Sequence, residues 1–229
     1  MKNLIVYISP AKDFIPECQI LAKIQIDNCH RLGWKPEDVL LVTNWDYEYN
    51  GIKSIVVGEE HYCPTRPRSL KTSIIPALYD LGVLEKGTIY WNHDFDAFQV
   101  NQMKDEDLGE GYDAWLTDYG WRDRWCMGSF FFKDTAKDIF ALAKPKIFQN
   151  IEDETVFMEL MQDPEIAKRC KRLNVTYNMG QRHITGNLKI IEKPLRVVHF
   201  HPNRQPLLDI FKTFLPADFL AILKEYKYE

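Results

Sequence analysis

Two short apolar runs separated by a helical pattern constrain the fold of this chain more than any other feature. Leu4–Ile8 and Val39–Thr43 are aliphatic and rich in β-branched residues, so each predicts a buried strand. Between them, Pro16 suits the first turn of a helix, and an apolar stripe continues from there to His30. A helix that connects two buried strands is typical of a βαβ unit, in which the strands run parallel and helices cover the sheet.

The same alternation continues to residue 98. Ile52–Val57 predicts a third strand, and Ser69 suits the N-cap of a second helix, in which Pro76 predicts a kink or a late start. Gly87–Phe98 then carries a fourth apolar, strand-like segment. We therefore expect an α/β fold with a mixed, mainly parallel sheet flanked by helices, whose N-terminal half is Rossmann-like.

The second half of the chain is less regular. Strands are expected at Tyr112–Thr117, Met127–Lys133, Val175–Asn178 and Leu195–Phe200, and helices from Asp134 to Ala143, from Asp153, and on either side of Pro216. Asn44–Gly51 predicts a polar loop, and the charged run Lys168–Arg172 predicts a solvent-exposed helix face. Because no linker or repeat interrupts the chain, we expect a single domain over residues 1–229.

Length and composition are typical of a soluble globular protein. The 229 residues suffice for one sizeable core, and 45% of them are apolar and 27% charged. The net charge of −4 provides no overall attraction to nucleic acid or anionic membranes. Five cysteines without a CxxC pair indicate a reduced protein with neither a disulfide framework nor a zinc site. Because the sequence contains neither a signal peptide nor a long apolar stretch, we expect a cytoplasmic protein.

Asp94 and Asp96 are the sharpest candidate site. Residues i and i+2 of a strand share a face, so the two carboxylates are expected to meet at the carboxyl end of a buried strand. In open sheets of parallel strands, ligands bind at that edge. Two adjacent carboxylates are unfavourable without a cation, and hard oxygen ligands suit Mg²⁺ or Mn²⁺. The alternative is an aspartate pair that caps a turn.

A late histidine pair offers a further metal ligand. His199 and His201 share one face of the predicted strand that precedes Pro202. Imidazole suits Mn²⁺ better than Mg²⁺, so either histidine could complete the coordination of a cation held by the aspartates. The alternative is a histidine whose ring is hydrogen-bonded to the backbone at the end of a strand.

Two charged groups are candidates for substrate chemistry. Asp153 and Glu154 open a predicted helix, where acidic residues either complement the helix dipole or act as a general base. Arg66, Arg68 and Lys71 precede and enter the helix before the acidic strand. They would pair with a diphosphate or form an ordinary solvent-exposed cluster.

The loop that follows Asp118 is a candidate lid. Asp118 ends a predicted strand and is either a substrate contact or a turn residue. The aromatic and charged segment Tyr119–Trp125 could close over a ligand and exclude water. Glycine-rich dinucleotide and phosphate loops, a GxSxG motif and an HExxH motif are all absent, which argues against several other enzyme classes.

The order of these parts resembles that of nucleotide-sugar glycosyltransferases with the GT-A fold, and distantly that of glycogenin-like members. In that family a nucleotide-binding half ends in a strand and a DxD-type motif, which Asp94 and Asp96 match. The resemblance implies that Asp96 is a direct metal ligand and that Asp94 faces the sugar nucleotide and the metal. His199 resembles the late histidine that ligates the metal in glycogenin-like members.

The resemblance implies roles for other residues as well. Ser9 and Asn44 match positions that hold the nucleoside, and Gly128 would lie near the donor sugar. Asp153 and Glu154 fall where the family has an acidic or amide pair beside the acceptor.

The resemblance implies a metal-dependent glycosyltransferase, either a hexosyl- or a pentosyltransferase. With Mn²⁺ or Mg²⁺, it would move a sugar from a nucleoside diphosphate sugar to a hydroxyl of a glycan, a small molecule or a modified nucleic acid. Residues 1–98 would bind the nucleotide sugar, and residues 99–229 would form the acceptor side and the C-terminal helices. If the reaction inverts the anomeric carbon, Asp153 or Glu154 is the base; if it retains the configuration, they position the acceptor. The alternatives are a nucleotidyltransferase, which also uses paired aspartates, and a non-catalytic binding module on a transferase scaffold.

Overall fold

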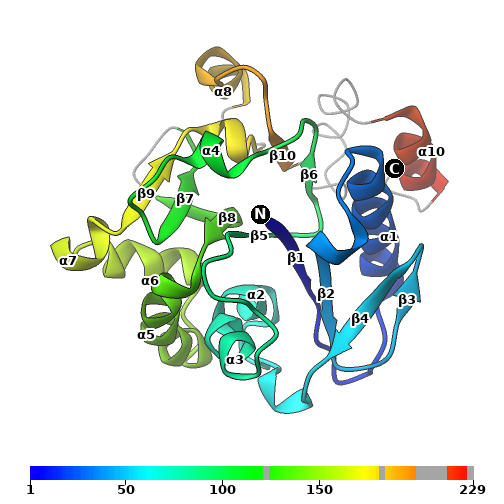
Figure 1. Cartoon of the computed structure of the whole chain (residues 1–229), viewed down its shortest axis with the longest axis horizontal. Helices are drawn as coiled ribbons and strands as arrows, with labels where there is room; N and C mark the ends of the chain where they lie inside the picture. Colours follow the sequence, from blue (N-terminus) through cyan, green and yellow to red (C-terminus); the bar gives the residue numbers. More distant parts are fainter. Residues whose placement is uncertain (121–123, 181–183, 200–215, 226–229) are drawn as a thin grey trace.

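An eight-stranded mixed sheet forms the centre of the computed structural model, which describes residues 1–120, 124–180, 184–199 and 216–225. The strand order is β3-β4-β2-β1-β5-β8-β7-β9, and helices lie on both sides of the sheet (Figure 1). Strands from both sides of residue 98 belong to this one sheet. The expected α/β class, with a mixed sheet flanked by helices, is confirmed.

The N-terminal half forms the parallel part of the sheet. Its elements are β1 (Lys2–Val6), α1 (Pro16–Arg31), β2 (Val39–Thr43), β3 (Glu48–Tyr49), β4 (Ile52–Val56), α2 (Leu70–Ser73), α3 (Ile75–Asp80) and β5 (Tyr90–His93). β1 pairs in parallel with β2 and with β5, and β2 pairs in parallel with β4. The carboxyl ends of these four strands therefore meet at one edge, as the βαβ pattern predicts.

Two local features of this half bear on the predictions. The expected loop Asn44–Gly51 contains β3, which pairs antiparallel with β4, so the loop prediction is wrong at this point. The helix expected after Ser69 is divided at Ile74 into α2 and α3, and Pro76 lies in the first turn of α3. Proline lacks an amide hydrogen and is tolerated there, so the predicted interruption is confirmed.

The C-terminal half adds antiparallel strands and most of the helices. Its elements are β6 (Ala97–Gln99), α4 (Asp105–Leu108), β7 (Ala114–Asp118), β8 (Trp125–Phe132), α5 (Lys137–Phe148), α6 (Asp153–Leu160), α7 (Pro164–Ala167), β9 (Cys170–Leu173), α8 (Ile184–Ile190), β10 (Val197–His199) and α10 (Ala217–Glu225). Short 3₁₀ turns lie at Pro36–Asp38, Glu59–His61, Pro67–Ser69, Asp134–Ala136 and Val175–Tyr177. Among the described helices, none combines the length and the apolar character needed to cross a membrane.

The strand pairing in this half brings distant segments together. β8 runs antiparallel to both β5 and β7, and β9 pairs in parallel with β7 at the edge of the sheet. β6 and β10 form a separate two-stranded antiparallel sheet, in which His199 lies opposite Ala97. This small sheet places the late histidine next to the segment that follows β5.

Three predictions for this half are wrong in detail. Residues 170–172 of the run Lys168–Arg172, expected on an exposed helix face, belong to the edge strand β9 because their backbone pairs with β7. Val175–Asn178 was expected as a strand, but residues 175–177 form a 3₁₀ turn, and the Asn174 side chain caps it by accepting from the Thr176 amide. The helix after Asp134 does not end at Ala143 but continues to Phe148, with Pro145 inside it. Of the two helices predicted on either side of Pro216, the first lies outside the described residues and the second is α10.

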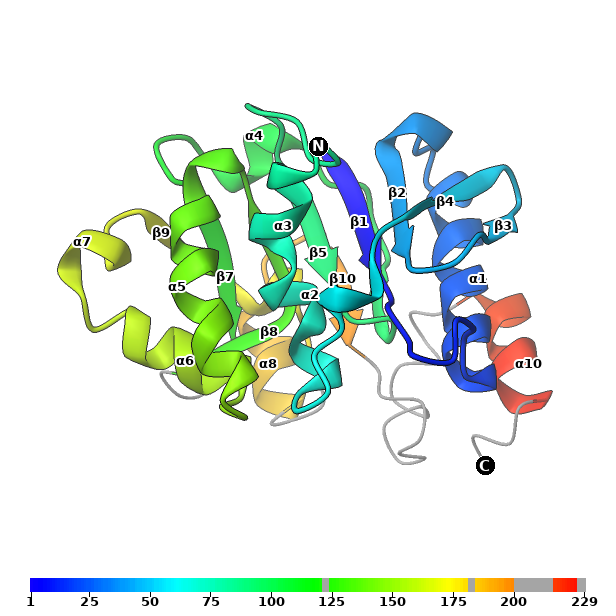
Figure 2. The same ribbon diagram turned by 90° about the horizontal axis from the view of Figure 1, so that it is seen from below.

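Alternate residues of the central strands face two different layers of helices. Leu4 on β1 packs into the large cluster formed with α2, α3, α5 and α6, whereas Ile5 packs into the cluster formed with α1. Figure 2 shows α2, α3, α5 and α6 on one side of the sheet, with α1 and α10 side by side at one end of the molecule. Because both faces of β1 are buried, this strand is apolar throughout its centre.

Candidate functional site

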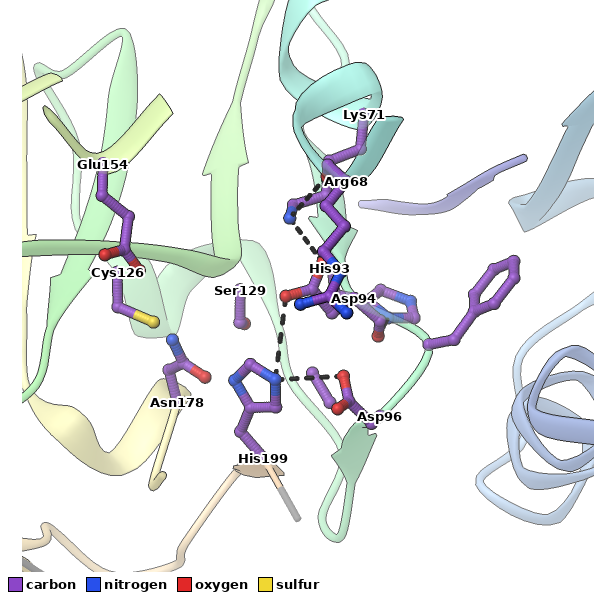
Figure 3. Close-up of polar contacts among 12 residues, drawn as sticks. Arg68, Lys71, His93, Asp94, Asp96, Cys126, Ser129, Glu154, Asn178 and His199 are labelled. Carbon is purple, nitrogen blue, oxygen red and sulfur yellow. Dashed lines mark hydrogen bonds and ion pairs between the residues drawn. The ribbon is translucent and has the colours of Figure 1, made fainter. Parts of the chain in front are cut away.

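Three side chains of the types that ligate metal ions converge at the carboxyl end of β5. One donor atom each from Asp94, Asp96 and His199 lies within 4.8 Å of the others. The His199 Nε2 atom is 3.0 Å from Asp96 Oδ1 and 3.7 Å from Asp94 Oδ2 (Figure 3). Two carboxylates and one imidazole are a donor set that fits Mn²⁺ or Mg²⁺. His201, the alternative ligand, lies outside the described residues.

The two aspartates reach this position through a turn. β5 ends at His93, and the amide of Ala97 donates to the carbonyl of Asp94 at 3.0 Å. The expectation that Asp94 and Asp96 share one strand face is therefore wrong, although their side chains do converge. The turn directs both carboxylates at His199, which β10 holds opposite Ala97.

Gly128 lies directly against this cluster. Between the pairs Leu116–Phe130 and Thr117–Cys126 the register of β7 and β8 shifts, so β8 bulges between them. The carbonyl of Gly128 accepts from the amide of Asp94 at 2.9 Å. A Cβ atom at Gly128 would lie 2.4 Å from Cε1 and 2.6 Å from Nδ1 of His199. Only glycine at this position leaves room for the His199 ring beside Asp94.

Lys71 supplies a partly buried positive charge next to the aspartates. Its ammonium forms an ion pair with Asp94, and its carbonyl accepts from the Asn92 side chain at 3.0 Å. Burial lowers the pKa of Lys71, but the charges of Asp94 and Asp153 more than offset this effect, and the pKa is raised. Arg68, one turn earlier, is exposed, and its guanidinium has no ion-pair partner among the residues that the structure describes. Both cations lie where a diphosphate could contact them.

The electrostatics of His199 follow from its two carboxylate neighbours. Burial lowers the pKa of His199, but the charge of Asp96 and the hydrogen bond to it outweigh burial and raise the pKa well above its usual value. His93, two residues before the turn centre, behaves in the opposite way. Its ring stacks on Trp91 and contacts the Asn3 side chain at 2.9 Å, and burial lowers its pKa to about 4. His93 is a neutral packing residue, whereas His199 belongs to the acidic cluster.

Ser9 and Asn44 join the ends of β1 and β2. The Asn44 amide donates to the carbonyl of Ser9 at 2.9 Å, and its oxygen accepts from the Ser9 amide at 3.0 Å. These two bonds hold the adjacent loops at the edge where the parallel strands end. Aromatic side chains pack beside them, and the rings of Tyr7 and Phe95 stack with centroids 5.6 Å apart.

Asp153 and Glu154 begin α6 but point to different partners. Asp153 is buried, and it accepts from the Thr72 hydroxyl and from the Glu154 amide, both at 3.0 Å. The Glu154 carboxylate accepts from the Tyr119 hydroxyl and lies 3.1 Å from Arg124. Burial raises the pKa of Glu154, and its contacts with Tyr119 and Arg124 offset this only in part.

The remaining candidates have structural partners. Asp118 accepts from the Gly120 amide at 2.6 Å and forms an ion pair with Arg172 on β9. Arg66 donates to the carbonyl of Asn150 at 3.0 Å. Asp118 therefore matches the alternative of a turn residue, and Arg66 matches the alternative of an ordinary surface charge. The centre of the candidate lid, residues 121–123, lies outside the described residues.

Sequence reasoning missed two side chains that lie close to His199. Figure 3 shows Cys126 and Asn178 on the side of the imidazole opposite Asp96. The Cys126 thiol lies on this side of the ring and contributes to the raised pKa of His199. Asn178 was expected on a strand, and only the 3₁₀ turn and the pairing of its neighbour Met179 with β10 bring it to this position.

No family model matches the chain, and no curated protein matches it in sequence. Its fold, however, is that of solved glycosyltransferases. A glycosyltransferase involved in the glycosylation of the major capsid of PBCV-1 matches 93% of this chain over 100% of its own length, with a TM-score of 0.55 and 15% identity. Mouse xyloside xylosyltransferase 1 matches 87% of this chain over 97% of its own, with a TM-score of 0.55 and 11% identity.

The glycosyltransferase GlyE of Streptococcus pneumoniae TIGR4 shares the same fold. It matches 99% of this chain with a TM-score of 0.57 and 14% identity, and this chain spans 63% of GlyE. At such identities the likeness concerns the fold alone. It confirms the glycosyltransferase-type architecture that the order of sequence elements predicts.

Proposed function

We propose that this protein is a metal-dependent glycosyltransferase that moves a hexosyl or pentosyl group from a nucleoside diphosphate sugar to a hydroxyl acceptor. One observation carries the proposal: Asp94, Asp96 and His199 converge on one point of a fold shared with glycosyltransferases. Partly buried Lys71 and exposed Arg68 adjoin this point, so anionic and cationic groups suited to a cation and a diphosphate lie together.

In this proposal Asp94, Asp96 and His199 hold Mn²⁺ or Mg²⁺. When bound, the cation would offset the negative charge that develops on the nucleoside diphosphate as the glycosidic bond breaks. Lys71, which carries its proton because Asp94 and Asp153 raise its pKa, would provide a second positive charge. Ser9 and Asn44 would shape the nucleoside edge of residues 1–98, and Gly128 would leave room at the cluster.

In this proposal Glu154, and not Asp153, acts on the acceptor hydroxyl. Both oxygens of Asp153 are already bonded, to Thr72 and to the Glu154 amide, which suits a residue that fixes α2 against α6. The partners of Glu154, Tyr119 and Arg124, flank the segment expected to act as a lid. In an inverting reaction Glu154 would accept the proton of the attacking hydroxyl, and in a retaining reaction it would orient that hydroxyl.

Calorimetric titration with UDP, GDP and a panel of their sugars, with Mn²⁺ and with EDTA, tests this function. We expect nucleotide binding that requires Mn²⁺, together with slow release of free sugar from the donor. Asp96→Asn should lower the Mn²⁺-dependent affinity by more than about 100-fold, because loss of a direct ligand exceeds the usual effect of an outer-shell change.

Asp80→Asn is a matched control, since Asp80 is an exposed carboxylate paired with Lys137 on the surface. Nucleotide binding that is indifferent to Mn²⁺, or unchanged in Asp96→Asn, contradicts the proposal. Consumption of a nucleoside triphosphate and a sugar phosphate would instead indicate a nucleotidyltransferase.

A further inference from the structure

Asn178 has a buried amide oxygen that lacks a hydrogen-bond partner among the described residues. The residue follows the 3₁₀ turn Val175–Tyr177 and is 2% exposed. Its Oδ1 atom is closed to solvent and accepts no hydrogen bond from the part of the chain that the structure describes. Buried polar atoms are rarely left unpaired, because an unsatisfied acceptor costs about 1–3 kcal/mol. A group that bonds to this oxygen in another state of the site would remove that cost.

The orientation of the amide is determined by its neighbours. Thr117 donates its hydroxyl proton to the carbonyl of Ser129 at 3.0 Å, so its oxygen can only accept from Asn178. The Asn178 Nδ2 atom donates to this oxygen at 3.1 Å. The nitrogen end of the amide is therefore held at the β8 bulge, and the oxygen end must point elsewhere.

The side chain on the oxygen side is His199. Figure 3 shows Asn178 facing the edge of the imidazole that is turned away from Asp94 and Asp96. The two residues are held in register by the backbone, because the amide of His199 donates to Met179 at 2.9 Å and the amide of Met179 donates to Val197 at 3.0 Å. Gly128 packs against the same ring and limits where it can move.

We propose that Asn178 is a positioning residue for His199, whose Nδ1–H donates to the Asn178 oxygen when Nε2 ligates a cation held with Asp94 and Asp96. A histidine that ligates a metal usually donates its other ring hydrogen to an oxygen, which sets the tautomer and the ring orientation. The inference rests on the proposed function, because it requires a cation at the cluster. In this structure Nε2 is bonded to Asp96, and the bond to Asn178 belongs to the cation-bound state.

The Cys126 thiol is the competing acceptor for the same ring hydrogen. It lies beside His199, on the same side as Asn178 (Figure 3). Sulfur is a weak acceptor, whereas an amide oxygen is a strong one. Since the Asn178 oxygen is closed to solvent, a protein donor reaches it more readily than a substrate hydroxyl does.

Titration of the protein with Mn²⁺ alone, followed by the electron paramagnetic resonance signal of the free ion, tests this assignment. Asn178→Ala should weaken Mn²⁺ binding by about 10- to 100-fold, the usual effect of losing an outer-shell partner. Asn178→Asp keeps an oxygen acceptor and should restore most of the affinity. Cys126→Ala should stay close to wild type. With Mg²⁺ bound, ¹⁵N NMR of the histidine side chains should show the Nδ1–H tautomer of His199 in wild type and a tautomer mixture in Asn178→Ala.

The outcomes separate this inference from the function on which it rests. If wild type shows no Mn²⁺-dependent nucleotide binding, the proposed function fails and the inference fails with it. If wild type binds Mn²⁺ and Asn178→Ala binds it equally well, only the inference is overturned. Equal weakening in Asn178→Asp and Asn178→Ala also overturns it, because the loss would then come from the amide hydrogen bond to Thr117. If circular dichroism shows that Asn178→Ala does not fold, the inference is tested by two other results. These are the Mn²⁺ affinity of Asn178→Asp and the His199 tautomer of the wild-type protein.

Discussion

Two acidic pairs of this chain look alike in sequence and differ completely in the folded protein. Asp94 and Asp96 converge on His199, with Lys71 beside them. Asp153 and Glu154 diverge, since Asp153 bonds to Thr72 in the interior and Glu154 bonds to Tyr119 and Arg124. The first pair forms one site that fits a cation, whereas the second pair is two separate residues.

The backbone explains the difference. The first pair lies on a turn closed by the bond from Ala97 to Asp94, so both side chains face β10. The second pair occupies successive positions of a helix, and successive helical residues point in directions about 100° apart. In this protein the two acids therefore converge where the chain turns and diverge where it forms a helix. Substitutions at the first pair should therefore affect metal binding, whereas Glu154→Gln in the second pair should affect sugar transfer.

The largest effect is expected from Glu154→Gln. If Glu154 handles the acceptor proton, the transfer rate should fall by about 10²- to 10⁴-fold, the usual contribution of general acid–base catalysis. Mn²⁺-dependent nucleotide binding should not change, because Glu154 does not belong to the Asp94 cluster. Rapid-quench measurement of transfer from the donor that binds best would check this. A variant that transfers at the wild-type rate would remove Glu154 from the reaction.

Gly128→Ala tests the first pair from the opposite strand. The added Cβ would lie 2.4 Å from Cε1 of His199 and 3.2 Å from Oδ2 of Asp94, so the ring must move from its present position. We expect Mn²⁺ affinity to fall by about 10- to 100-fold, as when the orientation of a ligating histidine is lost. Gly186→Ala is the control, since nothing lies within 4 Å of a Cβ there. Unchanged Mn²⁺ affinity in Gly128→Ala would show that His199 does not need its present position.

Asp153→Ala should affect stability and leave the metal site intact. Removal of this buried carboxylate leaves the Thr72 hydroxyl without its acceptor, and the free energy of unfolding should fall by about 1–3 kcal/mol. Urea denaturation at neutral pH measures this change, and a Mn²⁺ titration of the folded variant serves as the comparison. If Asp153→Ala lost Mn²⁺ binding without losing stability, Asp153 would instead belong to the metal site with Asp94 and Asp96.

The smallest expected effect is the dependence of the transfer rate on pH. Burial raises the pKa of Glu154 above its usual value of 4.5, while Tyr119, Arg124 and Lys71 pull it down and Asp153 pushes it up. A raised pKa means that the basic form is lost as the pH falls through that value, so the transfer rate should decline on the acidic side at a pH above 4.5. The same shift favours the folded state at low pH and loses this contribution as the pH rises through the folded-state pKa. The acidic limb should disappear in Glu154→Gln, and its persistence would assign the titration to another group.

Local sequence determined much of the N-terminal half. The apolar runs and Pro16 placed β1, α1 and β2 within a few residues, and Pro76 marked the division between α2 and α3, because burial pattern and proline geometry act over short distances. Asp94 and Asp96 were identifiable from their place after a buried strand. The order of the parts was enough to predict the class of fold.

Only the tertiary structure decided how the site is assembled. The pairing of β6 with β10 sets His199 opposite Ala97, and the bulge in β8 brings Gly128 and Thr117 to the cluster. The edge strand β9 escaped prediction because its charged residues carry no apolar alternation and its conformation depends on the pairing with β7. Each of these features depends on hydrogen bonds between distant segments, and no local pattern of residues encodes which segments will meet.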